Sequence, residues 1–157
     1  MAQINVADLY KQTRLKLKLN WIAGLDGGNK LLNSDNVTKP SLALIGHLNF
    51  VHPNRLQVLG SAEMDYLRSL SIIAMQQAIT NLYSTDLAAV LIANGEKPPK
   101  ELIQAANLHN TPLLTSTMQS PRLMDLLSHY LKQVIADFHN DYPFAFQHYY
   151  NHYQNLK

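Results

Sequence analysis

Hydrophobic and polar positions in the first part of the chain change their period within thirty residues. Three apolar positions before Thr13 repeat at helical spacing, and these are Val6, Leu9 and Tyr10. From Arg14 to Leu19, leucines alternate with basic residues, which is the period of a strand with one buried face. The pattern predicts a short helix and then a strand that continues to Gly24. Asp26–Asn29, with two adjacent glycines, predicts a tight reversal with positive φ.

The middle of the chain alternates between strand-length and helix-length patterns. Residues Arg55–Gly60 alternate apolar and polar side chains and predict a strand. Ser61 then opens a helical pattern, which continues as an apolar stripe along Ile72–Tyr83. The short apolar run Ser41–Gly46 fits either a buried strand or a helical turn.

The second half of the chain predicts a strand, a helix and a strand in succession, and then a long helix. Leu87–Ala93 is a continuous apolar run, typical of a strand buried on both faces. A helix follows Pro98–Pro99, and Thr111–Thr115 returns as a strand, so the crossover favours parallel, right-handed pairing. The residues on the apolar face of that helix are Leu102, Ile103, Ala106 and His109. The last helix opens at Ser120–Pro121. We therefore predict one α/β domain with a mixed or mostly parallel sheet flanked by helices.

Composition indicates the size of the core and the cellular location of the protein, but it says little about the reaction or ligand. The 157 residues are 46% hydrophobic, enough for one core of ordinary size. A net charge of +2, from 13 basic and 11 acidic residues, gives no reason to expect a nucleic acid as partner. The lack of cysteine excludes disulfides, thiolate nucleophiles and cysteine-based zinc sites. A polar start and no apolar run near about 20 residues predict neither signal peptide nor membrane span, so we expect a cytoplasmic protein.

A series of segments carries a resemblance to one known family. The segments are Leu15–Leu17, Trp21–Gly24, Asn49–Gly60, Ser120–Pro121 and Leu127–Leu131. In this order they resemble the amino-terminal domain of bacterial HPr kinase/phosphorylase, and the last two resemble the helix that leads out of it. The resemblance covers residues 1–136, which we predict to be one domain, and leaves residues 137–157 as a tail.

The resemblance implies a fold similar to the first domain of the muramyl-peptide ligases, in an enzyme that is usually a hexamer. The complete family enzyme phosphorylates a serine of the carrier protein HPr with ATP or pyrophosphate, and it also reverses that reaction by phosphorolysis. That chemistry belongs to a second domain with a phosphate-binding loop. This sequence contains no Gly-x-x-x-x-Gly-Lys-Ser/Thr motif, so we predict no catalytic residue and no cofactor.

Two groups of polar residues beside predicted strands are candidates for binding a ligand or partner. His52, Asn54 and Arg55 offer an imidazole, an amide and a guanidinium to an anionic group, with turn and cap chemistry as the alternative. Asn94 and Gly95 follow the most buried strand, at the edge where open α/β sheets bind ligands, although a plain turn also explains them. No Gly-x-Ser-x-Gly elbow orders the serines, which argues against a hydrolase.

The tail 137–157 holds more than half of the aromatic residues of the chain. It fits a segment that docks a partner, one that folds back on the domain, or the accidental end of a truncated gene. His148 and His152 are four residues apart, so on a helix both imidazoles could face one metal ion. The further ligands that such a site needs would come from Asp137, His139 or Asp141. No cysteine or His-Glu-x-x-His pattern supports a metal site, and we predict none.

Two hypotheses of different classes follow. The first, which we favour, is a non-catalytic regulatory or assembly module related to HPr kinase/phosphorylase. Its expected partners are HPr, a kinase domain or a second copy of the chain. The second is one part of a split or truncated HPr serine kinase, active only when a separate chain supplies the phosphate loop. A neighbouring reading frame that encodes this loop would favour the second.

Overall fold

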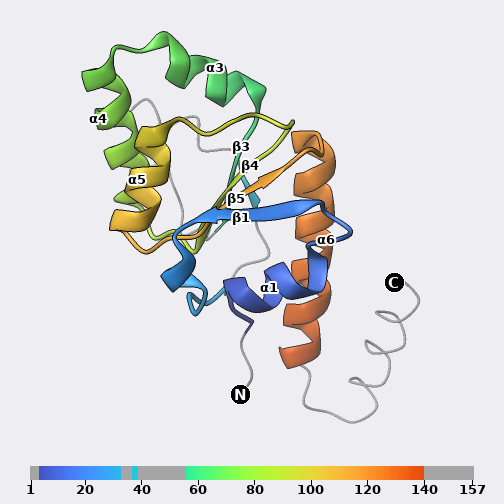
Figure 1. Ribbon diagram of the computed structural model, residues 1–157. Helices are drawn as coiled ribbons and strands as arrows, with labels where there is room; N and C mark the ends of the chain where they lie inside the picture. The colour runs from blue at the N-terminus through green and yellow to red at the C-terminus, as the bar shows by residue number, and fades with distance from the viewer. Residues whose placement is uncertain (1–3, 33–36, 39–55, 140–157) are drawn as a thin grey trace.

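The strands that the structure describes form one mixed sheet (Figure 1). The computed structural model describes residues 4–32, 37–38 and 56–139. Within these residues the sheet has five strands, in the order β1-β5-β4-β3-β2. Their bounds are β1 (Leu19–Ala23), β2 (Val37–Thr38), β3 (Leu56–Leu59), β4 (Ala89–Ile92) and β5 (Leu113–Ser116). Strands β2 to β5 pair in parallel and β1 pairs antiparallel with β5, which confirms the predicted mixed, mostly parallel sheet.

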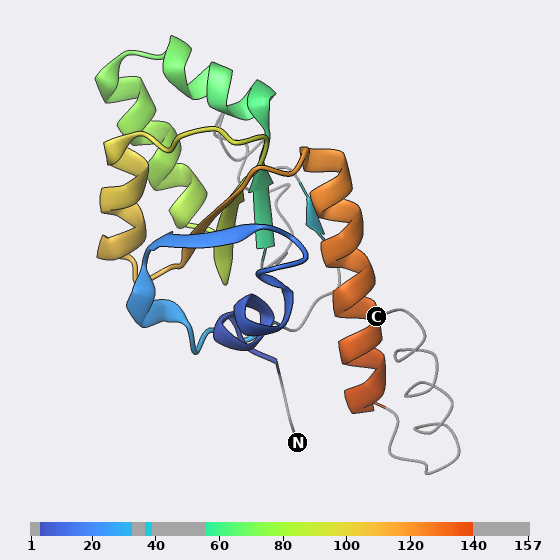
Figure 2. The ribbon, with the colours of Figure 1, turned by 45° about the vertical axis from the view of Figure 1, so that its right-hand side comes forward.

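Helices cover both faces of this sheet (Figures 1 and 2). Their bounds are α1 (Val6–Thr13), α3 (Ser61–Ser69), α4 (Ile72–Tyr83), α5 (Lys100–Leu108) and α6 (Ser120–His139). Buried side chains of α3, α4 and α5 share one core with the sheet, and those of α1 and α6 share the other. None of these helices is long and apolar enough to cross a membrane, over the part of the chain that the structure describes.

Successive residues of the central strands point into opposite cores. In β4, Leu91 packs on the side of α1 and α6, while Val90 and Ile92 pack on the side of α3, α4 and α5. In β5, Leu114 and Leu113 divide in the same way. Strands buried on both faces favour apolar side chains at successive positions, which explains the uninterrupted apolar run that predicted β4.

Side-chain caps set the ends of helices where the hydrophobic pattern alone does not. α1 is capped by the preceding Asn5, whose Oδ1 accepts the Asp8 N–H at 2.8 Å. α4 is capped by the preceding Ser71, whose Oγ accepts the Ala74 N–H at 3.1 Å. This cap follows an extended Leu70, so the helical pattern that runs on from Ser61 is divided into two helices, α3 and α4.

The segment between α1 and β1 corrects one prediction. Arg14–Lys18 forms turns instead of a strand, and β1 starts only at Leu19. The backbone stays in helical-type turns after α1, because the Leu17 N–H donates to Thr13 O at 2.8 Å. Leu15 is 83% exposed, so the alternation of leucines there does not mark a buried strand face.

Three further details differ from the sequence-based expectations. The positive φ expected within Asp26–Asn29 lies just before it, at Gly24, where φ is 67°, and the 3-10 helix η1 (Leu25–Gly27) follows. Gln57, a polar position in the alternating pattern of β3, is only 1% exposed, since helices cover both faces of the strand. His109 does not lie on the apolar face of α5 but caps the helix, exposed, with its ring stacked on Tyr83. The run Ser41–Gly46 lies outside the described residues.

Candidate functional site: a polar cavity at the carboxyl edge of the sheet

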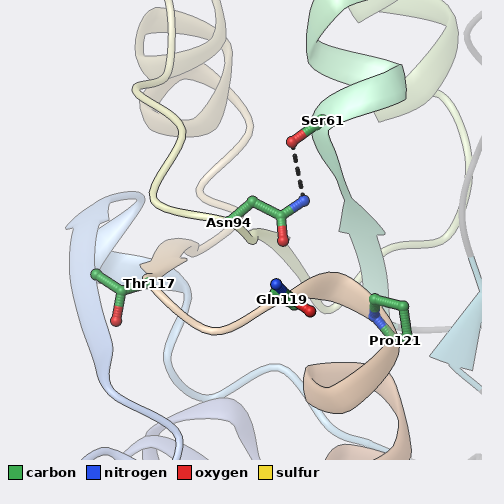
Figure 3. A pocket seen from close by; sticks show the side chains of 5 residues that line it. All are labelled: Ser61, Asn94, Thr117, Gln119 and Pro121. Atoms are coloured by element: carbon green, nitrogen blue, oxygen red, sulfur yellow. Dashed lines mark hydrogen bonds between the residues drawn. The ribbon is translucent and has the colours of Figure 1, made fainter.

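A cavity of about 500 Å³ lies where strands β3, β4 and β5 end (Figure 3). The described residues that line it are Ser61, Asn94, Thr117, Gln119 and Pro121. The chain leaves β3 and β4 toward helices on one face of the sheet, and it leaves β5 toward α6 on the other. Where neighbouring strands send the chain to opposite faces, a crevice opens at their carboxyl ends, and ligands of open α/β sheets bind there. The cavity occupies this position.

Asn94 joins the elements around the cavity. Its φ is 63°, in the left-handed region that asparagine tolerates better than most residues. Its backbone N–H donates to Met118 O at 2.8 Å. Its side-chain Nδ2 donates to Ser61 Oγ at 3.0 Å, as drawn in Figure 3, and its Oδ1 accepts the Ser120 N–H at 3.0 Å. One amide therefore ties together the first turns of α3 and α6.

The Ser61 hydroxyl extends this network to an ion pair. Ser61 Oγ donates to Glu96 Oε2 at 3.0 Å, and Arg68 Nη2 donates to Glu96 Oε1 at 2.5 Å. The hydrogen bond from Arg68, and then that from Ser61, hold the pKa of Glu96 below its ordinary value. Arg68 also pairs with Asp65 at 3.2 Å, and its bond to Glu96 raises the pKa of the guanidinium. The charged groups beside the cavity, Glu96, Arg68 and Asp65, thus form ion pairs with one another.

A second carboxylate lies at the start of α3. Glu63 is buried, and its Oε1 accepts the Gly60 N–H at 2.7 Å. An acidic side chain in the first turn complements the positive end of the helix dipole. Two carboxylates, those of Glu63 and Glu96, therefore accept hydrogen bonds from residues at the start of α3.

Two polar side chains of the cavity wall remain available for hydrogen bonds to a ligand. Thr117 and Gln119 are exposed, and neither side chain makes a hydrogen bond with another residue that the structure describes. The described side chains of the wall are thus hydroxyls, amides and one proline, none of which ionises near neutral pH. This arrangement can hold a ligand by hydrogen bonds, but these side chains offer no general acid or base.

The candidate residues from the sequence fall in different places. Asn94 lines the cavity. Gly95 beside it has φ 68° and its Cβ position faces open space, as in a plain turn. The other candidates lie outside the residues, or the side chains, that the structure describes: His52, Asn54, Arg55, Asp137, His139, Asp141, His148 and His152. Within the described part of the chain, no three His, Cys, Asp or Glu residues come together as a metal site.

Sequence reasoning missed most of the cavity wall. Ser61 and Pro121 were identified only as helix starts, although a helix start directly after a parallel strand is itself a signal for this edge of a sheet. Thr117 and Gln119 carry no such signal. Their place depends on where β5 ends and how the chain turns into α6, and neither follows from hydrophobic period.

Comparison with known proteins gives a consistent assignment. Residues 4–131 match the family described as HPr Serine kinase N terminus. The HPr kinase/phosphorylase of Chromobacterium violaceum is 44% identical over 136 residues, which are 87% of this chain and 42% of that protein. The proteins of the same name from Neisseria meningitidis serogroup C and Burkholderia ambifaria are 39% and 32% identical, with 87% and 86% of this chain covered. The chain spans 42% of the length of each of these relatives. On this evidence it belongs to the family of HPr serine kinase amino-terminal domains.

Proposed function

We propose that the domain is a non-catalytic regulatory or assembly module of HPr kinase/phosphorylase signalling, and that it acts by binding at the polar cavity. The observation that carries the proposal is the chemistry of the cavity wall, whose described side chains, apart from Pro121, are uncharged donors and acceptors. Phosphoryl transfer depends on cationic groups, metal ions and positioned backbone donors that stabilise developing charge. Neutral amides and hydroxyls suit recognition instead.

The relatives support the place of the domain in this pathway. They are named HPr kinase/phosphorylase, and the matched region is 42% of their length. The proposal assigns phosphoryl transfer to the remainder of such enzymes. It also includes a cytoplasmic location, which suits a chain without cysteine, and contact with HPr, a kinase domain or a second copy.

One fragment of a split or truncated HPr serine kinase is the second candidate function. The same partial coverage favours it, because a chain equivalent to 42% of an enzyme could be completed by a separate chain with the phosphate loop. The two candidates differ in one respect that can be measured. The fragment gains activity from a partner, whereas the module does not.

The test is a phosphorylation assay with the purified chain, HPr, magnesium and labelled ATP or pyrophosphate, run without and with a separate phosphate-loop domain. The mass of the chain in solution is recorded in parallel, with and without HPr. The complete Chromobacterium violaceum relative serves as the positive control for the assay. We expect no phosphoserine on HPr, together with an oligomer of the chain or a complex with HPr.

The remaining outcomes count against the proposal in different ways. Phosphoserine formed by the chain alone would overturn the non-catalytic role. Activity that appears only after addition of a separate phosphate-loop domain would favour the second candidate. If the chain is a monomer and binds neither HPr nor that domain, the proposed assembly role is wrong.

A further inference from the structure

We propose that the cavity at the carboxyl edge of the sheet binds a small, uncharged, polyhydroxylated molecule of the sugar class. The inference rests on the proposed function, since it treats the cavity as a binding site rather than a catalytic one. Its volume of about 500 Å³ falls within the range of small-molecule pockets, although the cavity is widely open to solvent. Its wall is more polar than the wall of most such pockets. A ligand that displaces water from this wall must therefore be polar itself, so that it can replace the hydrogen bonds that the water made.

The charges around the cavity argue against an anionic ligand. Glu63 accepts the Gly60 N–H and Glu96 accepts the Ser61 hydroxyl, so the start of α3 already has its acidic partners. Arg68 is engaged with Glu96 and Asp65. At the start of α6, the Ser120 N–H is already bonded to Asn94. An added phosphate or carboxylate would approach two carboxylates and find no cationic side chain among the described residues of the wall.

The groups that remain available both donate and accept hydrogen bonds. Gln119 has a whole amide to offer, Thr117 has a hydroxyl, and Asn94 has the second N–H of its amide beyond the bond to Ser61. A hydroxyl of a sugar likewise donates and accepts, so each of these side chains can pair with one without leaving a buried charge.

The positions of these groups suit one compact ligand. In Figure 3 Asn94 lies between Ser61 and Gln119, while Thr117 and Pro121 mark the two sides of the cavity. The proline ring adds an apolar surface, which can pack against the C–H face of a sugar ring. A bound molecule would contact both the start of α3, at Ser61, and the start of α6, at Pro121.

The test is an NMR titration of the full, isotope-labelled chain, with amide signals as the readout and neither HPr nor nucleotide present. Glucose, mannitol and myo-inositol are the uncharged probes, and glucose 6-phosphate and inorganic phosphate are the anionic ones. We expect saturable shifts of the amide signals of residues 94–95 and 117–120 with at least one uncharged probe. Neither anionic probe should bind more tightly.

Two variants make the test specific to the site. Gln119→Leu removes the free amide from an exposed position, and we expect it to weaken binding by about tenfold or more. Gln104→Leu makes the same change at an exposed position of α5 that does not line the cavity, and it should leave binding unchanged. Spectra that match the wild type elsewhere show that both variants are folded.

Three results would overturn the inference. These are tighter binding of either anionic probe than of every uncharged probe, no saturable shift with any uncharged probe, and equal binding by Gln119→Leu and the wild type. None of them bears on phosphoryl transfer, which the HPr assay measures separately. A failure of this inference can therefore be told from a failure of the proposed function.

Discussion

At the scale of single residues, the backbone and the side chain of Asn94 have separate roles. Its left-handed backbone turns the chain at the end of β4, and its amide links Ser61 of α3 to Ser120 of α6. Asn110 also has a positive φ, of 49°, but its side chain makes no hydrogen bond with another described residue. The two asparagines allow backbone and side chain to be tested apart.

We expect Asn94→Gly to destabilise the protein by about 1–3 kcal/mol, since glycine keeps the turn but loses two side-chain hydrogen bonds of about 1 kcal/mol each. Asn110→Gly should stay within about 1 kcal/mol of the wild type, because it changes only the backbone preference. Urea unfolding measures both. Equal effects of the two substitutions would show that the amide bridge contributes nothing.

Tyr83 presents the opposite case, a polar group without a partner. The residue is 7% exposed, and its hydroxyl has no hydrogen-bond partner among the described residues. Burial raises the pKa of this phenol, so the folded protein keeps it protonated. Tyr83→Phe should therefore leave stability at pH 7 unchanged or raise it by about 1 kcal/mol, as measured by urea unfolding.

The raised pKa of Tyr83 also makes the free energy of unfolding depend on pH in the alkaline range. Below the ordinary tyrosine pKa, near 10.0, the phenol is neutral in both the folded and the unfolded chain. Above it, only the unfolded chain ionises freely, so the free energy of unfolding falls as the pH rises. Tyr83→Phe should reduce this alkaline loss, and Tyr66→Phe, at an exposed site, should not. A marked loss of stability in Tyr83→Phe at pH 7 would reveal a partner for the hydroxyl.

At the scale of elements, the contact between the end of β1 and the start of β5 depends on glycine. Gly24 has φ 67°, and its N–H donates to Asn107 Oδ1 at 2.8 Å. A Cβ at this position would lie 2.1 Å from Thr111 O, a backbone atom that cannot move aside cheaply. Gly95 has nearly the same φ, 68°, with nothing near its Cβ position.

Substitutions at Gly24 and Gly95 distinguish the cost of backbone strain from the cost of a steric clash. Gly95→Ala should cost about 1–2 kcal/mol, the usual penalty of a left-handed alanine. Gly24→Ala should cost more than about 3 kcal/mol, since the clash with Thr111 adds to the same strain. Thermal unfolding of both variants provides the measurement. Similar losses would mean that β1 and β5 can separate locally at little cost.

The elements differ in how well their sequence predicts them. β4 and α5 were predicted because each depends on burial alone, which fixes a continuous or a helical apolar period. The turn at Arg14–Lys18 was not, because five residues are too few to distinguish alternation from a helical turn. Within the site, Asn94 stood out as a turn residue after a buried strand, whereas Gln119 gains its place only from tertiary structure.

At the scale of the whole molecule, the sheet supplies side chains to two cores. Leu82 is fully buried in the core with α3, α4 and α5, and Trp21, the one tryptophan of the chain, packs against the other core. Because β3, β4 and β5 supply side chains to both, neither core can keep its packing if the sheet is lost.

Leu82→Ala should therefore destabilise the protein by about 2–5 kcal/mol and shift the unfolding of both cores together. Trp21 fluorescence and far-UV circular dichroism, followed in one urea titration, should give coincident midpoints. Leu108→Ala, at a site 79% exposed, should change stability by no more than about 0.5 kcal/mol. A tryptophan transition that does not move in Leu82→Ala would show that the cores unfold independently.

The fold class was predictable at this scale, but the order of the strands was not. Alternating strand and helix patterns predict a layered α/β domain wherever they occur. The antiparallel pairing of β1 with β5 joins segments from opposite ends of the domain, and hydrophobic period contains no information about such partners.

The distance along the chain between these partners has a consequence for biosynthesis. The Ser116 hydroxyl donates to the Leu17 carbonyl across 99 residues, and β5 is the one partner of β1 among the described strands. At ribosomal rates of about 5–20 residues per second, β1 would leave the ribosome roughly 5–20 seconds before the segment that pairs with it. During that interval its unpaired edge is open to chaperones and to wrong strands alike, and the sheet is complete only when nearly all of the domain has been synthesised.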